Sequence, residues 1–159
     1  MADLGRPPTA AEPDHPEVSI HDRGWIGASP SDVYRTVASI ETYGSWWRTV
    51  TVETADSQLR LALPGVGRVN VRTGGERPNV GIVLQFSGDA TGVLEWYFEP
   101  FREGSVANVF LRLAQRPRRW NRGELAYRSA VRDGLLALRT LFEGRATAGE
   151  RPEAHADGR

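Results

Sequence analysis

The stretch that decides the fold is NRGELAYRSAVRDGLLALRTLFEG, residues 121–144. At 100° per residue it predicts an α-helix that carries Arg128, Arg132 and Arg139 on one side. The opposite side is built from small or apolar residues, namely Ala126, Ala130, Gly134, Ala137 and Leu141, flanked by Tyr127, Val131 and Leu138. A helix-interior glycine costs about 1 kcal/mol relative to alanine, so Gly134 indicates that something lies close to the helix at this point.

Two interpretations of this small-residue face remain open from the helix alone. A helix that covers a sheet normally presents large aliphatic side chains, and unfilled volume costs about 24 cal/mol per Å³. Either a hydrophobic ligand occupies a cavity beside the helix, or the small residues let the helix and sheet backbones approach closely.

The residues before the helix, 50–113, alternate between apolar and polar side chains with a period of two, which is typical of half-buried antiparallel strands linked by hairpins. The apolar rows include Leu59, Leu61 and Leu63; Val69 and Val71; Ile82, Leu84 and Phe86; and Leu94, Trp96 and Phe98. The strand over 105–113 is ambiguous. Its inward row is either Ala107, Val109, Leu111 and Leu113, which we choose for its cleaner apolar pattern, or Val106, Asn108, Phe110 and Arg112.

The N-terminal part of the chain predicts one strand and two short helices. Residues 18–27 form the strand, Ser29 is the N-cap of a helix with Pro30 at its first position, and a second short helix runs from Ile40 to about Trp46. The order is therefore strand, two helices, about six strands and a long helix, an α+β arrangement. The long helix is the large apolar cover that one sheet face requires.

Three stretches in this order resemble the helix-grip fold of the START/SRPBCC superfamily: IGASPSDVY at 26–34, IETYGSWW at 40–47, and LEWYFEP at 94–100 followed by Gly104-Ser105. The superfamily includes polyketide cyclases, plant pathogenesis-related proteins and lipid-transfer domains. Its second helix usually starts with an aspartate, where this chain has Ser39. The resemblance implies a curved antiparallel sheet of about seven strands wrapped around the long C-terminal helix, with a deep cavity for an apolar ligand between them. It implies no catalytic residues, because the superfamily shares none.

The chain is predicted to hold one domain. Residues 17–144 form the START/SRPBCC-like ligand-binding unit, and residues 1–16 and 145–159 are expected to be disordered tails, because they lack large apolar side chains in a periodic pattern.

Composition excludes several kinds of chemistry. The chain has no cysteine and no lysine, which removes disulfides, thiolate nucleophiles and Schiff-base lysines. Two of its three histidines, His15 and His155, lie in the expected tails, so we expect no metal site and no cofactor. With no apolar run long enough for a bilayer and no secretory signal, a cytoplasmic protein without stable membrane insertion is expected.

Charge is concentrated in the loop RPRRWNR at 116–122, although the formal net charge of the chain is zero. A solvated loop, a contact for an anionic group of a ligand, and a nucleic-acid site are the three interpretations. We expect no nucleic-acid partner, because the run is one short loop.

These patterns predict binding or transport of a hydrophobic small molecule, such as a lipid, an isoprenoid or a polyketide, in an internal cavity. Tyr127 or a rim arginine would orient it, and Trp46 and Trp47 would plug the sheet edge or gate the cavity. The predicted ligand wall, each member of which could instead be core, is Leu63, Ile82, Leu84, Phe86, Leu94, Trp96, Phe98, Tyr127, Ala130, Gly134 and Leu138.

The alternative function is a polyketide cyclase/aromatase-like enzyme that works without a metal or a covalent nucleophile. Its candidate polar groups are Tyr127, Asn108, Arg112 and His21.

Overall fold

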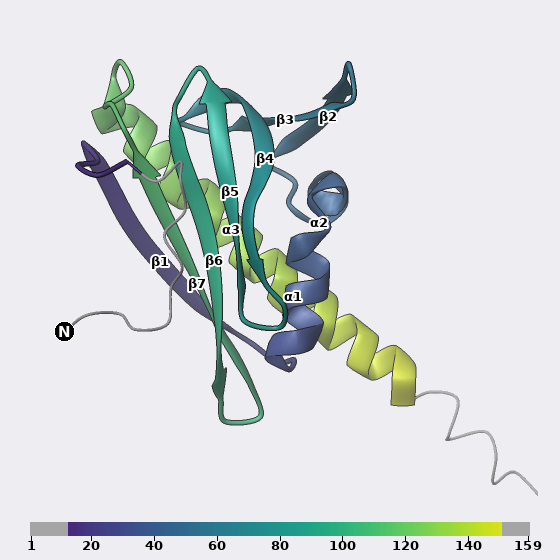
Figure 1. Cartoon of the computed structure of the whole chain (residues 1–159). Helices are drawn as coiled ribbons and strands as arrows, with labels where there is room; N and C mark the ends of the chain where they lie inside the picture. The colour runs from purple at the N-terminus through teal and green to yellow at the C-terminus, as the bar shows by residue number, and fades with distance from the viewer. Residues whose placement is uncertain (1–12, 151–159) are drawn as a thin grey trace, which may run out of the picture.

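A seven-stranded antiparallel sheet curves around one long helix in the computed structural model, which describes residues 13–150 (Figure 1). The order of the strands in the sheet is β1-β7-β6-β5-β4-β3-β2. The strands are β1 (Val18–Ile26), β2 (Thr51–Ala55), β3 (Gln58–Leu63), β4 (Gly67–Arg77), β5 (Gly81–Gly88), β6 (Gly92–Phe101) and β7 (Gly104–Leu113). Since β2 to β7 follow one another as hairpins, only β1 crosses over, and it pairs with β7.

Alternation along the strands separates an inner row from an outer row. Leu84 on β5, Leu94 on β6 and Leu111 on β7 lie side by side in the register and are fully buried in the core. On β7 the inner row is Ala107, Val109, Leu111 and Leu113, as chosen from the sequence. This register places the large apolar residues of neighbouring strands on the concave face, where a helix can cover them.

Two short helical segments connect β1 to β2 at the opposite edge of the sheet: α1 (Pro30–Ala38), then a 3₁₀ turn (Ile40–Thr42) that leads into α2 (Tyr43–Trp46). As predicted, Ser29 caps α1, its side chain accepting a hydrogen bond from the backbone N–H of Asp32. The buried hydroxyl of Tyr43 donates to the carbonyl of Val37 at 2.7 Å, which ties α2 to α1.

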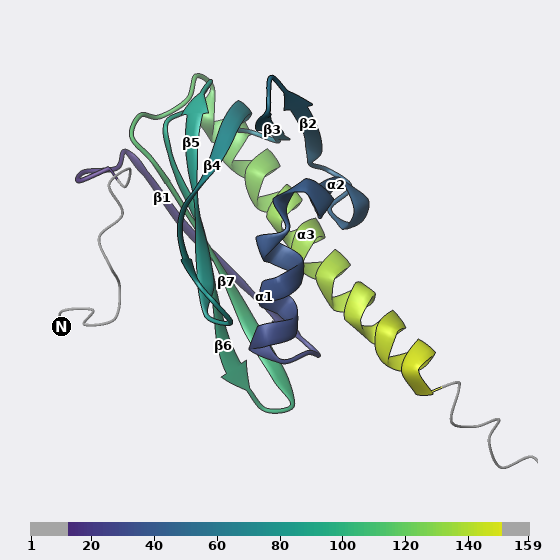
Figure 2. The same ribbon diagram turned by 45° about the vertical axis from the view of Figure 1, so that its right-hand side comes forward.

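The long helix α3 (Trp120–Glu150) crosses the concave face, packs mainly against β1 and extends beyond the sheet beside α1 (Figures 1 and 2). It runs further than the sequence predicts, because residues 145–150, which were expected to belong to the C-terminal tail, continue it. Of the remaining residues of the two predicted tails, 13–16 form no helix or strand, and 1–12 and 151–159 lie outside the described residues. Within the described part, no helix combines the length and the apolar character needed to cross a membrane.

This arrangement is the helix-grip fold that the sequence predicts: an α+β fold with two short helices after the first strand and a long C-terminal helix held by a curved sheet.

Candidate functional site

The small-residue face of α3 receives the side chain of Trp47, which follows α2. A Cβ built on Gly134 would come within 2.7 Å of the indole ring of Trp47, closer than real Cβ atoms approach other atoms. The same indole donates its N–H to the backbone carbonyl of Ala130 at 2.7 Å. The space that the sequence leaves free beside Gly134 is therefore taken, in this structure, by an indole of the protein itself.

Trp47 belongs to a continuous row of aromatic rings. Trp46 stacks on Trp47 with ring centroids 5.7 Å apart, Trp47 meets Trp96 edge-on at 5.9 Å, and Trp96 stacks on Phe98 at 6.2 Å. The row leads from α2 to the inner face of β6. It joins the surface around Trp46 to the middle of the concave face.

The eleven residues predicted to form a ligand wall all lie buried on this inner face or on the facing side of α3. Those from the sheet are Leu63, Ile82, Leu84, Phe86, Leu94, Trp96 and Phe98, and those from α3 are Tyr127, Ala130, Gly134 and Leu138. Burial on the concave face is common to the core of the domain and to the wall of a ligand site, so burial alone does not distinguish the two roles.

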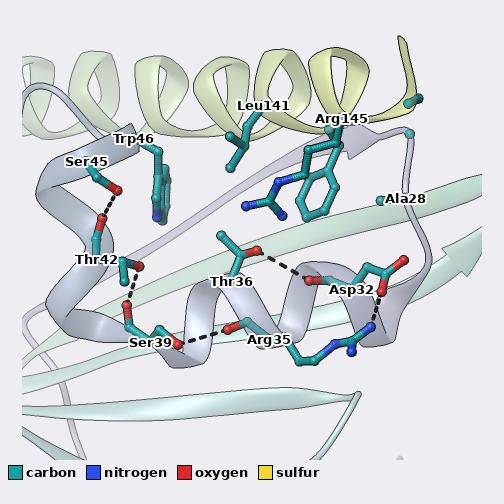
Figure 3. A pocket seen from close by; sticks show the side chains of 13 residues that line it. Ala28, Asp32, Arg35, Thr36, Ser39, Thr42, Ser45, Trp46, Leu141 and Arg145 are labelled. Carbon is teal, nitrogen blue, oxygen red and sulfur yellow. Dashed lines mark hydrogen bonds and ion pairs between the residues drawn. The ribbon is translucent and has the colours of Figure 1, made fainter. Parts of the chain in front are cut away.

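An open groove lies next to Trp46, between α1, α2 and the last turns of α3, with a volume of about 710 Å³. Thr36 lines it from α1, Trp46 from α2, and Leu141 and Arg145 from α3, with Ala28 at the end of β1 closing one side (Figure 3). Ligand sites in proteins commonly measure about 300–1,000 Å³, so the groove is large enough for a small molecule.

The indole N–H of Trp46 is a buried donor at this groove. Trp46 is only 7% exposed, and its Nε1 atom has no hydrogen-bond acceptor among the described residues. A buried polar group usually has a partner, and leaving one without it costs about 1–3 kcal/mol. Trp46 therefore brings a donor without a partner next to the groove, although the nitrogen atom itself is covered in this structure.

The hydroxyl groups along the floor of the groove offer hydrogen-bond acceptors to it, in contrast to the indole N–H of Trp46, which is a donor. Ser39, Thr42 and Ser45 each donate to a backbone carbonyl in the preceding turn, at 3.2, 2.7 and 2.6 Å. Because a hydroxyl donates one proton but accepts through two lone pairs, these groups present acceptors to the groove. The floor suits a guest that carries hydroxyl or amine protons.

Arg145 adds a cation at the C-terminal end of the groove. Its guanidinium group lies 5.1 Å from the ring centroid of Phe142 and points into the groove in Figure 3. The other arginine of the groove, Arg35, forms an ion pair with Asp32. Arg145 therefore gives the groove a positive charge close to the apolar surface of Leu141 and Phe142.

A second polar position lies under the first half of α3, between Tyr127 and Asp22. The Tyr127 hydroxyl and the Oδ2 atom of Asp22 are both buried and have no hydrogen-bond partner among residues 13–150. The Oδ1 atom of Asp22 lies 3.6 Å from a guanidinium nitrogen of Arg128. Burial, reinforced by the negative charge of Asp22, raises the pKa of the Tyr127 phenol well above its usual value, so this phenol stays protonated and can donate.

The other three polar candidates lie on the opposite side of the sheet. His21, Asn108 and Arg112 occupy outer-row positions, with His21 Nε2 2.8 Å from Asn108 Oδ1. The ring of His21 stacks on Phe110, and Arg112 pairs with Glu95. The structure thus does not bring them together with Tyr127, since neighbouring residues of a strand face opposite ways.

A metal site finds no support in the described part of the chain: within residues 13–150, no three His, Asp or Glu side chains gather closely enough to hold an ion.

The groove itself was missed from the sequence. Its hydroxyl residues, Thr36, Ser39, Thr42 and Ser45, look like ordinary helix-capping and turn residues. Arg145 falls in a segment that was expected to be a tail. The signal that pointed to this region was the pair Trp46-Trp47, which was assigned to a plug or a gate.

Comparison with known proteins supports the fold. No known family model matches the sequence, and neither does any curated protein sequence. Among solved structures, the chain is similar to the Zhui aromatase/cyclase from Streptomyces sp. R1128, with a TM-score of 0.62 and 14% sequence identity over 81% of this chain and 95% of that one.

Two further structures share the fold. A protein from Mesorhizobium loti has a TM-score of 0.60 and 12% identity over 79% of this chain and 97% of that one. The Aha1 dimer from Colwellia psychrerythraea has a TM-score of 0.53 and 18% identity over 77% of this chain and 93% of that one. These similarities confirm the helix-grip fold, and at this level of identity they show the fold alone. At such low identities they carry no activity over to this chain.

Proposed function

We propose that the protein binds a hydrophobic small molecule that carries at least one oxygen acceptor, such as a lipid, an isoprenoid or a polyketide. The observation that supports this proposal is the groove of about 710 Å³ lined by Trp46, whose buried indole N–H has no acceptor among the described residues. The apolar surfaces of Trp46, Leu141 and Phe142 supply the hydrophobic contact, at about 25 cal/mol per Å² of apolar area buried.

The polar groups orient the guest. A carbonyl or carboxylate oxygen accepts from Trp46 and lies near the guanidinium group of Arg145, and hydroxyl protons of the guest are donated to Ser39 or Thr42. This combination of an apolar wall with a few well-placed polar groups is typical of small-molecule sites.

The predicted ligand wall on the concave face extends this site inward. Trp47 separates the groove from Trp96 and from Gly134, because it stacks on Trp46 on one side and contacts both of them on the other. A long apolar guest reaches the inner wall when the indole of Trp47 rotates away. In this proposal the structure is the closed form, and Trp47 is the gate.

A cyclase/aromatase-like enzyme is the second candidate. It is supported by the similarity of the fold to that of an aromatase/cyclase from Streptomyces. Such an enzyme needs several polar side chains that converge on the guest. Of the four candidates, only Tyr127 lies on the concave side, while His21, Asn108 and Arg112 lie on the outer row. We therefore favour binding or transport over catalysis.

The test is native mass spectrometry of the protein purified from its own host, followed by titration with the apolar fluorescent probe N-phenyl-1-naphthylamine. We expect a copurified apolar molecule and saturable probe binding. Leu141→Trp, which places an indole in the groove, is expected to weaken probe binding by at least about tenfold, since the guest loses the volume that it occupies.

The matched control is Leu136→Trp, on the same helix at a position that is 61% exposed and outside the groove. It is expected to bind the probe like the wild type. Equal binding by the wild type and the Leu141→Trp variant, both folded by circular dichroism, would refute the proposed site.

A further inference from the structure

The segment 116–122, which is the end of the loop after β7 together with the first residues of α3, presents four arginine side chains within seven residues. Arg116, Arg119 and Arg122 line one hollow of about 660 Å³, together with Pro117, Trp120 and Asn121. Arg118 lines the neighbouring hollow, which the turn between β5 and β6 completes. Three cations of one segment thus face a common concave surface.

These guanidinium groups have no ion-pair partner among the described residues. The carboxylate nearest along the chain, that of Glu124, lies 3.6 Å from Arg128. The carboxylate of Asp89, in the neighbouring hollow, accepts from the backbone N–H of Arg68. Glu17 reaches the loop, but it accepts from the backbone N–H of Arg116, at 2.7 Å. Four arginines thus stand against the carboxylates of Glu17 and Asp89, so this segment keeps a net positive charge.

The loop is also held in place. Trp120 is only 6% exposed, so the start of α3 is anchored in the core. The turn between β3 and β4 presses on the first turn of α3, because a Cβ on Gly65 would lie 1.9 Å from the carbonyl oxygen of Gly123. Gly65 has a φ of +79°, which a glycine adopts without strain. A fixed backbone reduces the entropy lost when the arginines order around a ligand.

This hollow is remote from the groove beside Trp46. Arg119 precedes α3 and Arg145 lies near its other end, and at 1.5 Å per residue these positions are about 38 Å apart along the helix axis. The two sites are therefore independent, and the arginine loop is not the rim of the hydrophobic site.

We infer that the hollow formed by Arg116, Arg119 and Arg122 binds a phosphate-bearing ligand. The planar guanidinium fork matches the oxygens of a phosphate group with two parallel hydrogen bonds, and each such bond is strengthened by charge. A pyrophosphate group, with more than one phosphorus centre, uses several arginines at once. The group can belong to a soluble metabolite or to the headgroup of a lipid.

The experiment is isothermal titration calorimetry of the full chain with inorganic pyrophosphate at about 50 mM and about 200 mM NaCl. We expect saturable binding that weakens as the salt concentration rises. The variant with Arg116→Gln, Arg119→Gln and Arg122→Gln is expected to lose at least about tenfold in affinity. The control variant Arg23→Gln, Arg77→Gln and Arg132→Gln removes the same charge from three exposed positions elsewhere and is expected to bind like the wild type.

Two further arms identify the source of the phosphate group. If the wild type, but not the Arg116/Arg119/Arg122 variant, floats with phosphatidylglycerol vesicles and neither floats with phosphatidylcholine vesicles, the phosphate group belongs to an anionic lipid. If the wild type binds pyrophosphate but does not float with either kind of vesicle, the phosphate group belongs to a soluble ligand. Absence of pyrophosphate binding by the wild type, or equal weakening in both triple variants, overturns the inference. Binding of duplex DNA without binding of pyrophosphate also overturns it, in favour of a nucleic-acid surface. None of these outcomes depends on the hydrophobic site.

Discussion

The indole of Trp47 lies so close to Gly134 that a methyl group at position 134 would overlap the ring, with 2.7 Å between the new Cβ and the nearest ring atom. The contact joins the segment after α2 to the middle of α3, and the hydrogen bond from Trp47 to Ala130 fixes the ring one helical turn away. It explains why a residue without a side chain stands at position 134 of the helix.

Gly134→Ala is therefore expected to destabilise the domain, although alanine is the better helix former. The propensity gain is about 1 kcal/mol, but overpacking against a hydrogen-bonded ring costs about 1–3 kcal/mol and is the larger effect. Gly144→Ala is the matched control on the same helix, because a Cβ there meets no atom within 4 Å, and it is expected to add stability. Urea denaturation measures both. A Gly134→Ala variant as stable as Gly144→Ala would show that the Trp47 ring moves freely.

Replacing Trp47 with phenylalanine is expected to lower stability and to raise ligand uptake at the same time. The change removes the buried hydrogen bond to Ala130 and part of the ring that fills the space beside Gly134, at a cost of about 2–4 kcal/mol. If Trp47 is the gate, the space released accepts the apolar probe. Trp25→Phe, at a position that is 38% exposed and where the ring lies 5.5 Å from the Arg139 guanidinium carbon, is the control: it is expected to lower stability less than Trp47→Phe and to leave uptake unchanged. If the Trp47→Phe variant is less stable but takes up no more probe than the wild type, Trp47 is a core residue and not a gate.

Much of the fold was predictable from the sequence, because it is encoded locally. The alternation of Leu94, Trp96 and Phe98 defines a strand and its buried face, and Ser29 with Pro30 marks the start of α1. The end of α3 was not predictable. Residues 145–150 contain no large apolar side chain to mark a packed face, yet the helix continues through them beyond the sheet.

The site was harder to predict than the fold, because it depends on how distant segments meet. From the small face around Gly134, the sequence predicts either a ligand in a cavity or a close approach of the helix to the sheet, whereas in the structure the indole of Trp47 fills the space. Only the fold shows that Trp47, 87 residues away, supplies the group in this structure. The sequence does not show that Thr36, Ser39, Thr42 and Ser45 line a groove, because serine and threonine in helix turns commonly bond to nearby backbone carbonyls whether or not a groove is present.

Two buried tyrosines are expected to respond differently to loss of the hydroxyl group. Tyr43 donates to the carbonyl of Val37 at 2.7 Å, so Tyr43→Phe leaves a buried acceptor with one bond fewer and costs about 1–2 kcal/mol. Tyr127 has no hydrogen-bond acceptor in the described structure, so Tyr127→Phe is expected to leave stability unchanged or slightly raised. Urea denaturation compares the pair, and a loss for Tyr127→Phe as large as that for Tyr43→Phe would show that its hydroxyl is bonded when the protein is in solution.

The same two tyrosines predict how the protein unfolds in alkali. Burial raises the pKa of both phenols well above the value of about 10 that holds in the unfolded chain. Below pH 10 the phenols are protonated in both states, so their contribution is fully present. Above pH 10 the unfolded chain releases these protons and the folded one keeps them, so stability falls by about 1.4 kcal/mol per pH unit for each tyrosine.

Lysine and cysteine add nothing to this alkaline loss, because the chain has neither. Tyr34 adds to it, because burial and the nearby Glu76 raise the pKa of its phenol as well. Urea midpoints measured at pH 9, 10 and 11 are expected to fall steeply only in the last interval, with the slope of Tyr127→Phe about half that of the wild type if the two tyrosines dominate. The two buried phenols are expected to ionise only when the protein unfolds, so their tyrosinate absorbance near 295 nm should rise together with unfolding and not before it. A wild-type slope unchanged by Tyr127→Phe would mean that this phenol ionises in the folded protein, which requires water or a polar guest beside Asp22 and Tyr127.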